Sequence, residues 1–176
     1  MAHYWPYYCE ENVWWLACDL HSQAGAAIFI SGAEDRVVMA AQRAGAPPHG
    51  VLCWDYHVVL MRWRETAWEI VDPDCTAPEA AEGLRLDEYA RISFPALTDR
   101  WAHCAPRFRI VDAPTFTSTF ASDRRHMRDD QGGWLEPPPP WPCVGTGHSL
   151  DSFRAMSADH GNDTISLAEL LRRYGD

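Results

Sequence analysis

Polar residues followed by a long apolar run stand near the start of the chain. Glu10, Glu11 and Asn12 come directly before the apolar stretch Val13–Leu20. Negative side chains in a first turn are typical of a helix N-terminus, where unpaired backbone N–H groups carry positive partial charge. The pattern predicts a helix that begins near Cys9.

Four segments further along alternate or concentrate apolar residues as strands do. They are Ala26–Ser31, Val51–Trp63, Trp68–Asp72 and Phe108–Asp112. The connection Arg64–Ala67 is so short that the second and third segments must form an antiparallel hairpin. We therefore expect an antiparallel sheet of at least four strands, with the Cys9 helix against one face.

A short helix is predicted at the end of the chain, over Ser166–Tyr174. Ser166 can cap its first turn, and Glu169 follows three residues later, as in a capping box. Helices that flank one antiparallel sheet define an α+β fold class.

Two registers of the hairpin fit its length, and they differ in the partner of His57. In the first, His57 lies directly opposite Asp72. The second closes the hairpin with a pair between Arg64 and Ala67. His57 then lies opposite Asp74, with Asp72 diagonal to it on the same face. Either register lets a carboxylate reach the imidazole, and the pattern does not choose between the two aspartates.

Little regular structure is expected between residues 123 and 143. Asp129–Gly133 has the composition of a turn, and Pro137–Pro140 forms a stiff polyproline segment without backbone donors. On composition alone, such a segment favours a surface linker or a ligand for another module. Trp134 and Trp141 on either side of it suggest instead a rigid wall beside a small cleft.

Composition indicates a single soluble domain over residues 1–176. The chain has 47% hydrophobic residues and nine tryptophans, enough for one core. It shows no apolar run that would cross a membrane and no signal-peptide pattern, so a cytoplasmic location is expected. The six scattered cysteines are then expected to be free thiols. A zinc site at Cys53 and His57 would need two further ligands that no spacing supplies, so no metal is expected.

The net charge of −10 argues against a nucleic-acid partner, which would require a basic face. An acidic protein is compatible with a site that attracts cations, such as the ammonium group of a peptide N-terminus.

Cys9, His57 and an aspartate of the hairpin are candidates for a nucleophile, its base and the group that orients the base. The helix dipole lowers the pKa of a thiol at a helix start. Glu10 and Glu11 raise that pKa again, so a nearby imidazolium is the decisive influence. A buried inert cysteine and a structural His–Asp pair are the alternative explanation of the same residues.

Several longer motifs point to one family. They are Tyr8-Cys9-Glu10-Glu11-Asn12, Trp54-Asp55-Tyr56-His57-Val58-Val59, Phe120-Ala121-Ser122-Asp123-Arg124 with His126-Met127, and Trp134 with Glu136-Pro137-Pro138-Pro139-Pro140 and Pro142-Cys143. On these residues the chain resembles the protein N-terminal glutamine amidohydrolases, which deamidate an N-terminal glutamine to glutamate in the N-degron pathway. The likeness is weak over residues 21–50 and 76–106.

The resemblance implies a triad with Cys9 as nucleophile, His57 as base and Asp72 as orienting acid. It also implies a papain-like or transglutaminase-like arrangement, a thioester intermediate and no cofactor. Its substrates would be proteins or peptides with a free N-terminal glutamine, and the enzyme is expected to be a monomer. A cysteine peptidase or a transglutaminase-like acyltransferase with the same triad is the alternative, and a non-catalytic binding module is a third.

The matched motifs also contain candidates for the group that binds the substrate ammonium. They are Glu10, Asp55 and Asp123, with Ser122 beside the last. Asp123 is favoured among them because a loop residue is free to point into a cleft.

Overall fold

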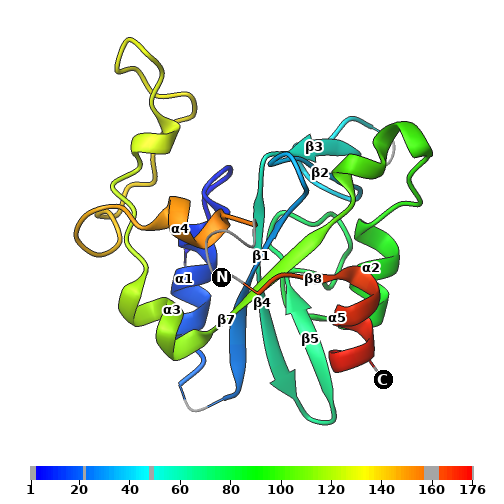
Figure 1. The fold of residues 1–176 in the computed structure, drawn as a ribbon. Helices are drawn as coiled ribbons and strands as arrows, with labels where there is room; N and C mark the ends of the chain where they lie inside the picture. The colour runs from blue at the N-terminus through cyan, green and yellow to red at the C-terminus, as the bar shows by residue number, and fades with distance from the viewer. Residues whose placement is uncertain (1–2, 22, 48–49, 157–162, 176) are drawn as a thin grey trace.

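A six-stranded antiparallel sheet forms the middle layer of the computed structural model, in the order β6-β5-β4-β1-β7-β8 (Figure 1). The structure describes residues 3–21, 23–47, 50–156 and 163–175. The strands are β1 (Gly25–Ser31), β4 (His57–Arg64), β5 (Ala67–Val71), β6 (Leu84–Arg85), β7 (Arg107–Asp112) and β8 (Ile165–Ser166), and a separate small sheet pairs β2 (Val37–Met39) with β3 (Leu52–Trp54). The antiparallel sheet predicted from the sequence is confirmed, with two further short strands at its edges.

Helices cover both faces of the sheet (Figure 1). One face carries α1 (Cys9–Cys18), α3 (Ala113–Thr119) and α4 (Leu150–Arg154), and the other carries α2 (Leu86–Ser93) and α5 (Leu167–Tyr174). Two 3₁₀ turns, Asp99–Cys104 and Arg125–Met127, lie in the connections. An antiparallel sheet with helices on both faces confirms the α+β class. No helix of the described residues has the length and apolar character to cross a bilayer.

The alternation of side chains along β4 explains why both faces are covered. Val58 and Leu60 belong to the core cluster under α1, α3 and α4, whereas Val59 and Met61 belong to the cluster under α2 and α5. Successive residues of a strand point to opposite faces, so a central strand with apolar residues at every position needs a cover on each side.

Two helix caps show how local chemistry sets the element boundaries. The Ser166 hydroxyl accepts the backbone N–H of Glu169 at 3.2 Å, which confirms the predicted cap of α5. Asp112 caps α3 in the same way, by accepting the N–H of Thr115 at 2.9 Å. The α3 helix was not predicted, although an aspartate two residues before Pro114 is a recognisable helix start.

The predicted strand Val51–Trp63 is wrong as one element. The chain breaks at Asp55 and Tyr56, so β3 joins the small sheet and β4 starts at His57. The Asp55 carboxylate accepts the backbone N–H of Tyr56 at 2.9 Å, a local bond that competes with strand pairing. His57 consequently stands at the end of a sheet strand, beside the bend, rather than inside a long strand.

The hairpin adopts the second of the two possible registers. Arg64 pairs with Ala67, and the pairing of β4 with β5 ends at Leu60 and Val71. Asp72 therefore lies just beyond the ladder, where its backbone N–H bonds to the carbonyl of Ala80 at 2.8 Å. Freed from the ladder, Asp72 turns to reach the histidine although the register alone would place Asp74 opposite it.

Candidate active site

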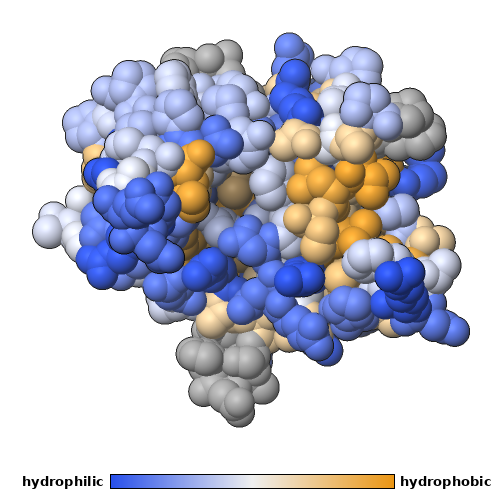
Figure 2. Space-filling model, turned by 90° about the horizontal axis from the view of Figure 1, so that it is seen from above, coloured by the Kyte–Doolittle hydropathy of each residue, from blue (hydrophilic) through white to orange (hydrophobic). Residues whose placement is uncertain are grey.

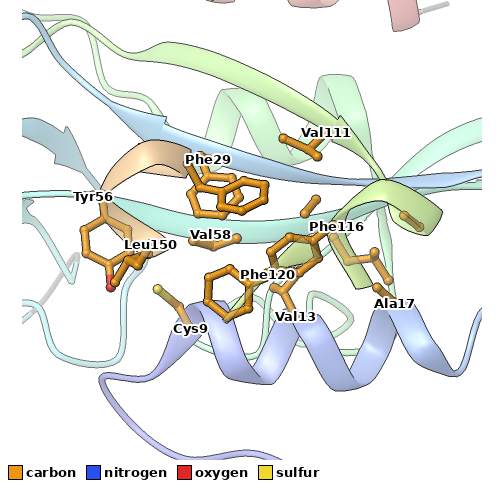
Figure 3. Close-up of a cluster of buried hydrophobic side chains, with 14 of the residues drawn as sticks. Cys9, Val13, Ala17, Phe29, Tyr56, Val58, Val111, Phe116, Phe120 and Leu150 are labelled. Carbon is orange, nitrogen blue, oxygen red and sulfur yellow. The ribbon is translucent and has the colours of Figure 1, made fainter. Parts of the chain in front are cut away.

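Cys9 is the first residue of α1, as the sequence predicts. Its side chain points toward the sheet and lies in the core cluster near Val58 and Phe120 (Figure 3). Cys9 is 9% exposed, and its thiol donates to the carboxylate of Glu10, with 3.7 Å between Sγ and Oε2. Since helix N-terminal N–H groups have no intrahelical acceptor, the backbone N–H of Cys9 is available to a ligand.

His57 and Asp72 form a fully buried pair. His57 Nε2 lies 3.0 Å from Asp72 Oδ1, which also accepts the backbone N–H of Asp74 at 3.0 Å. The second oxygen, Oδ2, accepts the hydroxyl of Tyr89 at 2.8 Å and the amide of Gln42 at 3.4 Å. Four donors thus hold the carboxylate, so it stays ionised and fixes the orientation of the imidazole.

The pKa directions follow from this geometry. Burial alone raises the pKa of Asp72, but the charge of His57 and the hydrogen bonds from His57, Tyr89 and Gln42 prevail and lower it. Burial likewise opposes the protonated form of His57, but the charge and hydrogen bond of Asp72 raise its pKa above the usual value. For Cys9, burial and then the charges of Glu10 and Asp74 raise the thiol pKa well above its ordinary range. These surroundings therefore favour the protonated thiol.

A cavity of about 350 Å³ brings these groups together. It is lined by Tyr7, Cys9, Trp54, Asp55, Tyr56, His57, Asp74, His126, Met127, Leu135 and Arg154. The lining comes from α1, from the β3–β4 segment, from the loop after β5, from the loop 123–143 and from α4. The indole of Trp54 stacks on His57 with 5.9 Å between ring centroids, and its Nε1 donates to Gln42 at 3.3 Å. The same glutamine thus supports both Trp54 and Asp72.

The polyproline loop is fixed to α1 by a buried ion pair. The Arg124 guanidinium donates to both carboxylate oxygens of Glu11, at 2.7 and 2.8 Å, and to the backbone carbonyls of Pro139, Trp141 and Pro142. The Trp141 indole donates to the same carboxylate at 2.8 Å. Tyr8 and Trp5 bond to carbonyls of residues 136 and 137. The loop is thus a rigid part of the fold, as its flanking tryptophans suggested.

The residues predicted to bind the ammonium lie in different surroundings. Asp55 lines the cavity, and its carboxylate is 3.4 Å from Nη1 of Arg154. Glu10 is fully buried behind the lining, where Oε2 accepts the Tyr56 hydroxyl at 3.1 Å. Ser122 is buried and pairs with Val144 through its backbone.

Asp123, the favoured candidate, is outside the lining of the cavity. Its carboxylate bonds to the guanidinium of Arg125 and lies 3.3 Å from Nδ1 of His148. Asp123 thus pairs with Arg125 of its own loop and with His148 just before α4, and not with a group that lines the cavity.

His57, Asp72 and Asp74 offer potential metal-ligand atoms within 4.8 Å of one another, as a search of the described residues shows. His57 Nε2 and both oxygens of Asp72 already make hydrogen bonds, so a metal ion would have to displace them. Cys53, considered above as a zinc ligand, is an exposed residue of β3 and does not line the cavity. All six cysteines are free.

Sequence reasoning missed several residues that support the site. Tyr89 on α2 and Gln42 in the loop after β2 both donate to Asp72. His126 lines the cavity with Nε2 3.2 Å from Oε1 of Glu10. His126 stands in a matched motif and could have been found there. The other two lie in segments where the sequence carries no comparable signal, and they reach Asp72 only through tertiary packing.

The fold and site define an α+β protein with a helix-borne cysteine and a sheet-borne His–Asp pair in one cavity. The chain belongs to the N-terminal glutamine amidase family, which matches residues 4–174. The protein N-terminal glutamine amidohydrolase of Homo sapiens is 35% identical over 180 residues, covering 96% of this chain and 85% of the human protein. The proteins of the same name from Arabidopsis thaliana and Danio rerio are 38% and 32% identical, over 92% and 96% of this chain and 77% and 87% of their own.

Proposed function

We propose that this protein hydrolyses the side-chain amide of an N-terminal glutamine, leaving N-terminal glutamate and releasing ammonia. One observation carries the proposal. In a chain of the N-terminal glutamine amidase family, Cys9 at a helix start lines the same cavity as His57, whose Nε2 is held by Asp72. The names of the relatives agree with this reaction.

In the proposed mechanism, His57 acts as general base on a neutral thiol. Because Nε2 bonds to Asp72, Nδ1 is the nitrogen that takes the Cys9 proton as Sγ attacks the carboxamide carbon. The negative charge that develops on the carbonyl oxygen is stabilised by the backbone N–H of Cys9 at the start of α1.

Two further steps complete the turnover. His57 returns its proton to the departing nitrogen, the C–N bond breaks, and ammonia is released. The side-chain carbonyl carbon of the substrate remains bound to Cys9 Sγ as a thioester. Water then gives a proton to His57 and attacks the thioester carbon. The C–S bond breaks, the peptide is released with an N-terminal glutamate, and His57 returns the proton to the sulfur. Asp72 stays ionised and stabilises the imidazolium in both halves of the reaction.

The same proposal covers the architecture and the setting of the enzyme. Residues 1–176 act as one N-terminal glutamine amidohydrolase domain with a papain-like or transglutaminase-like plan, in which the nucleophile opens α1, the base opens β4 and the acid directly follows β5. The family match over residues 4–174 supports this extent. We propose that it works as a cytoplasmic monomer on proteins with a free N-terminal glutamine, without metal or cofactor.

Ammonia release from a panel of Gln-initiated peptides tests the function. We expect Cys9→Ala and His57→Ala to abolish release while the protein stays folded, and Asp72→Asn to lower turnover on the order of a thousandfold or more. Cys143→Ala, at an exposed cysteine outside the cavity lining, is the matched control. Near wild-type release from Cys9→Ala protein would overturn the mechanism.

The rival functions give different results in the same assay. A transglutaminase-like enzyme would release ammonia from internal glutamine, and a cysteine peptidase would cleave the peptide without releasing ammonia. A binding module would do neither.

A further inference from the structure

The substrate of the proposed function carries a positive charge close to the reacting carbon. Four bonds separate the ammonium nitrogen of an N-terminal glutamine from its side-chain carbonyl carbon, a reach of roughly 5 Å. When that carbon meets the sulfur of Cys9, the ammonium must lie inside the same small cavity. A cation withdrawn from water needs an acceptor there, best a carboxylate.

Most carboxylates around the cavity already have cationic or phenolic partners. Asp55 faces Arg154, and Glu10 lies behind the lining against Tyr56 and His126. Asp72 has four hydrogen bonds of its own and stands behind His57. Asp55 and Asp72 thus already have cationic partners, and Glu10 does not line the cavity.

Asp74 differs from Glu10 because it lines the cavity, and from Asp55 because its side-chain hydrogen-bond partner is an uncharged hydroxyl rather than an arginine. It lines the cavity, is 7% exposed, and offers an oxygen within 4.8 Å of the His57 imidazole. One oxygen, Oδ1, accepts the Tyr4 hydroxyl at 2.8 Å. The nearby Arg43 donates through Nε to the carbonyl of Pro73 at 2.9 Å, rather than to the Asp74 carboxylate.

The electrostatic surroundings of Asp74 favour the arrival of a cation. Burial and the charge of Asp72 raise the pKa of Asp74, while His57, the Tyr4 hydrogen bond and Arg43 offset this only in part. Its ionised form is therefore poorly stabilised by the protein groups around it. A bound ammonium would supply the missing positive charge.

We propose that Asp74 accepts the α-ammonium of the N-terminal glutamine and thereby restricts the enzyme to unblocked chain ends. This assignment rests on the proposed function. It also explains selectivity for side-chain length. With the ammonium anchored beside His57, an asparagine side chain is one methylene too short to place its carbonyl carbon on Cys9.

The test compares a Gln-initiated peptide with the same peptide that carries a 4-carbamoylbutanoyl group, which lacks only the ammonium. For Asp74→Asn protein we expect kcat/KM on the Gln peptide to fall about 10- to 100-fold, mainly through KM, as expected for a lost charged hydrogen bond. The rate on the des-amino peptide should not change. Asp87→Asn, an exposed aspartate of α2, is the matched control and should leave both rates unchanged.

Equal losses on both peptides would overturn the proposal, because they would show that Asp74 acts through His57 or through the fold. The proposal would also be overturned if Asp55→Asn protein no longer preferred the Gln peptide over the des-amino peptide while Asp74→Asn protein still did. The role would then belong to Asp55. If Asp74→Asn does not fold, Asp74→Glu serves instead. Its longer carboxylate should shift the preference from Gln toward Asn peptides, and an unchanged preference would contradict the assignment.

Failure of the proposed function gives a separate signature. In that case wild-type protein releases no ammonia from any Gln peptide. Titration calorimetry of Cys9→Ala protein with the two peptides still reads the ammonium site, because it needs no turnover. We expect Cys9→Ala protein to bind the des-amino peptide more weakly than the Gln peptide. If this difference in affinity disappears when Asp74→Asn is added, the result supports the ammonium site at Asp74 without any turnover. Equal binding of the two peptides to the Cys9→Ala protein would overturn it.

Discussion

At the scale of single residues, Glu10 is the group that opposes the proposed nucleophile most directly. Its fully buried carboxylate accepts the thiol of Cys9 at 3.7 Å and the hydroxyl of Tyr56 at 3.1 Å. After burial, its charge is the main reason for the raised pKa of Cys9. In the proposed mechanism, Glu10 and His57 therefore compete for the thiol proton.

Substituting Glu10 by glutamine removes the charge and keeps an acceptor for the hydroxyl of Tyr56. We expect the pKa of Cys9 to fall, and labelling by iodoacetamide at neutral pH to become faster by roughly tenfold for each unit of that fall. Mass spectrometry of the labelled Cys9 peptide between pH 6 and 9 measures the shift. Glu79→Gln, at an exposed residue outside the cavity, should label as the wild type does. An unchanged profile in Glu10→Gln protein would show that the thiol does not sense this charge.

At the scale of elements, the loop 123–143 owes its order to one arginine. Proline has no N–H, so the polyproline segment cannot join a ladder and its carbonyls need donors from elsewhere. Arg124 supplies them from a left-handed backbone conformation, with a φ of 62°, while it pairs with Glu11 on α1. His126, Met127 and Leu135 of this loop line the cavity, so the pair also shapes the site.

Arg124→Met breaks this pair and leaves the buried Glu11 carboxylate without a cationic partner, although the Trp141 indole still donates to it. We expect the free energy of unfolding to fall by about 3–5 kcal/mol, the usual cost of an uncompensated buried charge. Arg125→Met is the matched control, because its ion pair with Asp123 is exposed to solvent. Urea denaturation of both variants measures the difference. Similar midpoints for the two variants would refute a structural role for the buried pair.

At the scale of the whole molecule, the site depends on both layers that flank the sheet. Cys9 comes from α1 on one face, and Tyr89, which holds Asp72, comes from α2 on the other. The site therefore exists only when both cores are formed. The upper surface, on which β2 and β3 lie, shows apolar patches between hydrophilic areas (Figure 2).

The buried His57–Asp72 pair should make global stability depend on pH. The folded-state pKa of His57 is raised, so its contribution is fully present below the unfolded value of about 6.5 and is lost as pH rises through the folded pKa. We expect the free energy of unfolding to decline from about pH 6.5 upward. Urea denaturation at intervals between pH 6 and 8 measures the slope. His57→Gln should flatten it, whereas His103→Gln, at an exposed residue, should retain it. Equal slopes in all three proteins would contradict this linkage.

Local pattern determined those features of the protein whose causes are local. The α1 helix starts at Cys9 because acidic residues precede an apolar run, α5 is capped by Ser166, and the connection after Arg64 is too short for anything but a hairpin. These outcomes depend on backbone and side-chain groups a few residues apart, which a sequence displays directly. The motifs likewise sufficed to place the chain in its family.

Tertiary structure decided what depends on contacts distant in sequence. The break between β3 and β4 could not be predicted, because strand pairing ends where neighbouring strands end. The residue pattern left the partner of His57 open between Asp72 and Asp74, and only the family resemblance indicated Asp72, which turns to His57 beyond the ladder. The burial of Asp74 and its bond to Tyr4 were equally invisible, since they are set by segments that pack from elsewhere in the chain. A sequence shows which charges exist, and only the fold determines which of them line a cavity.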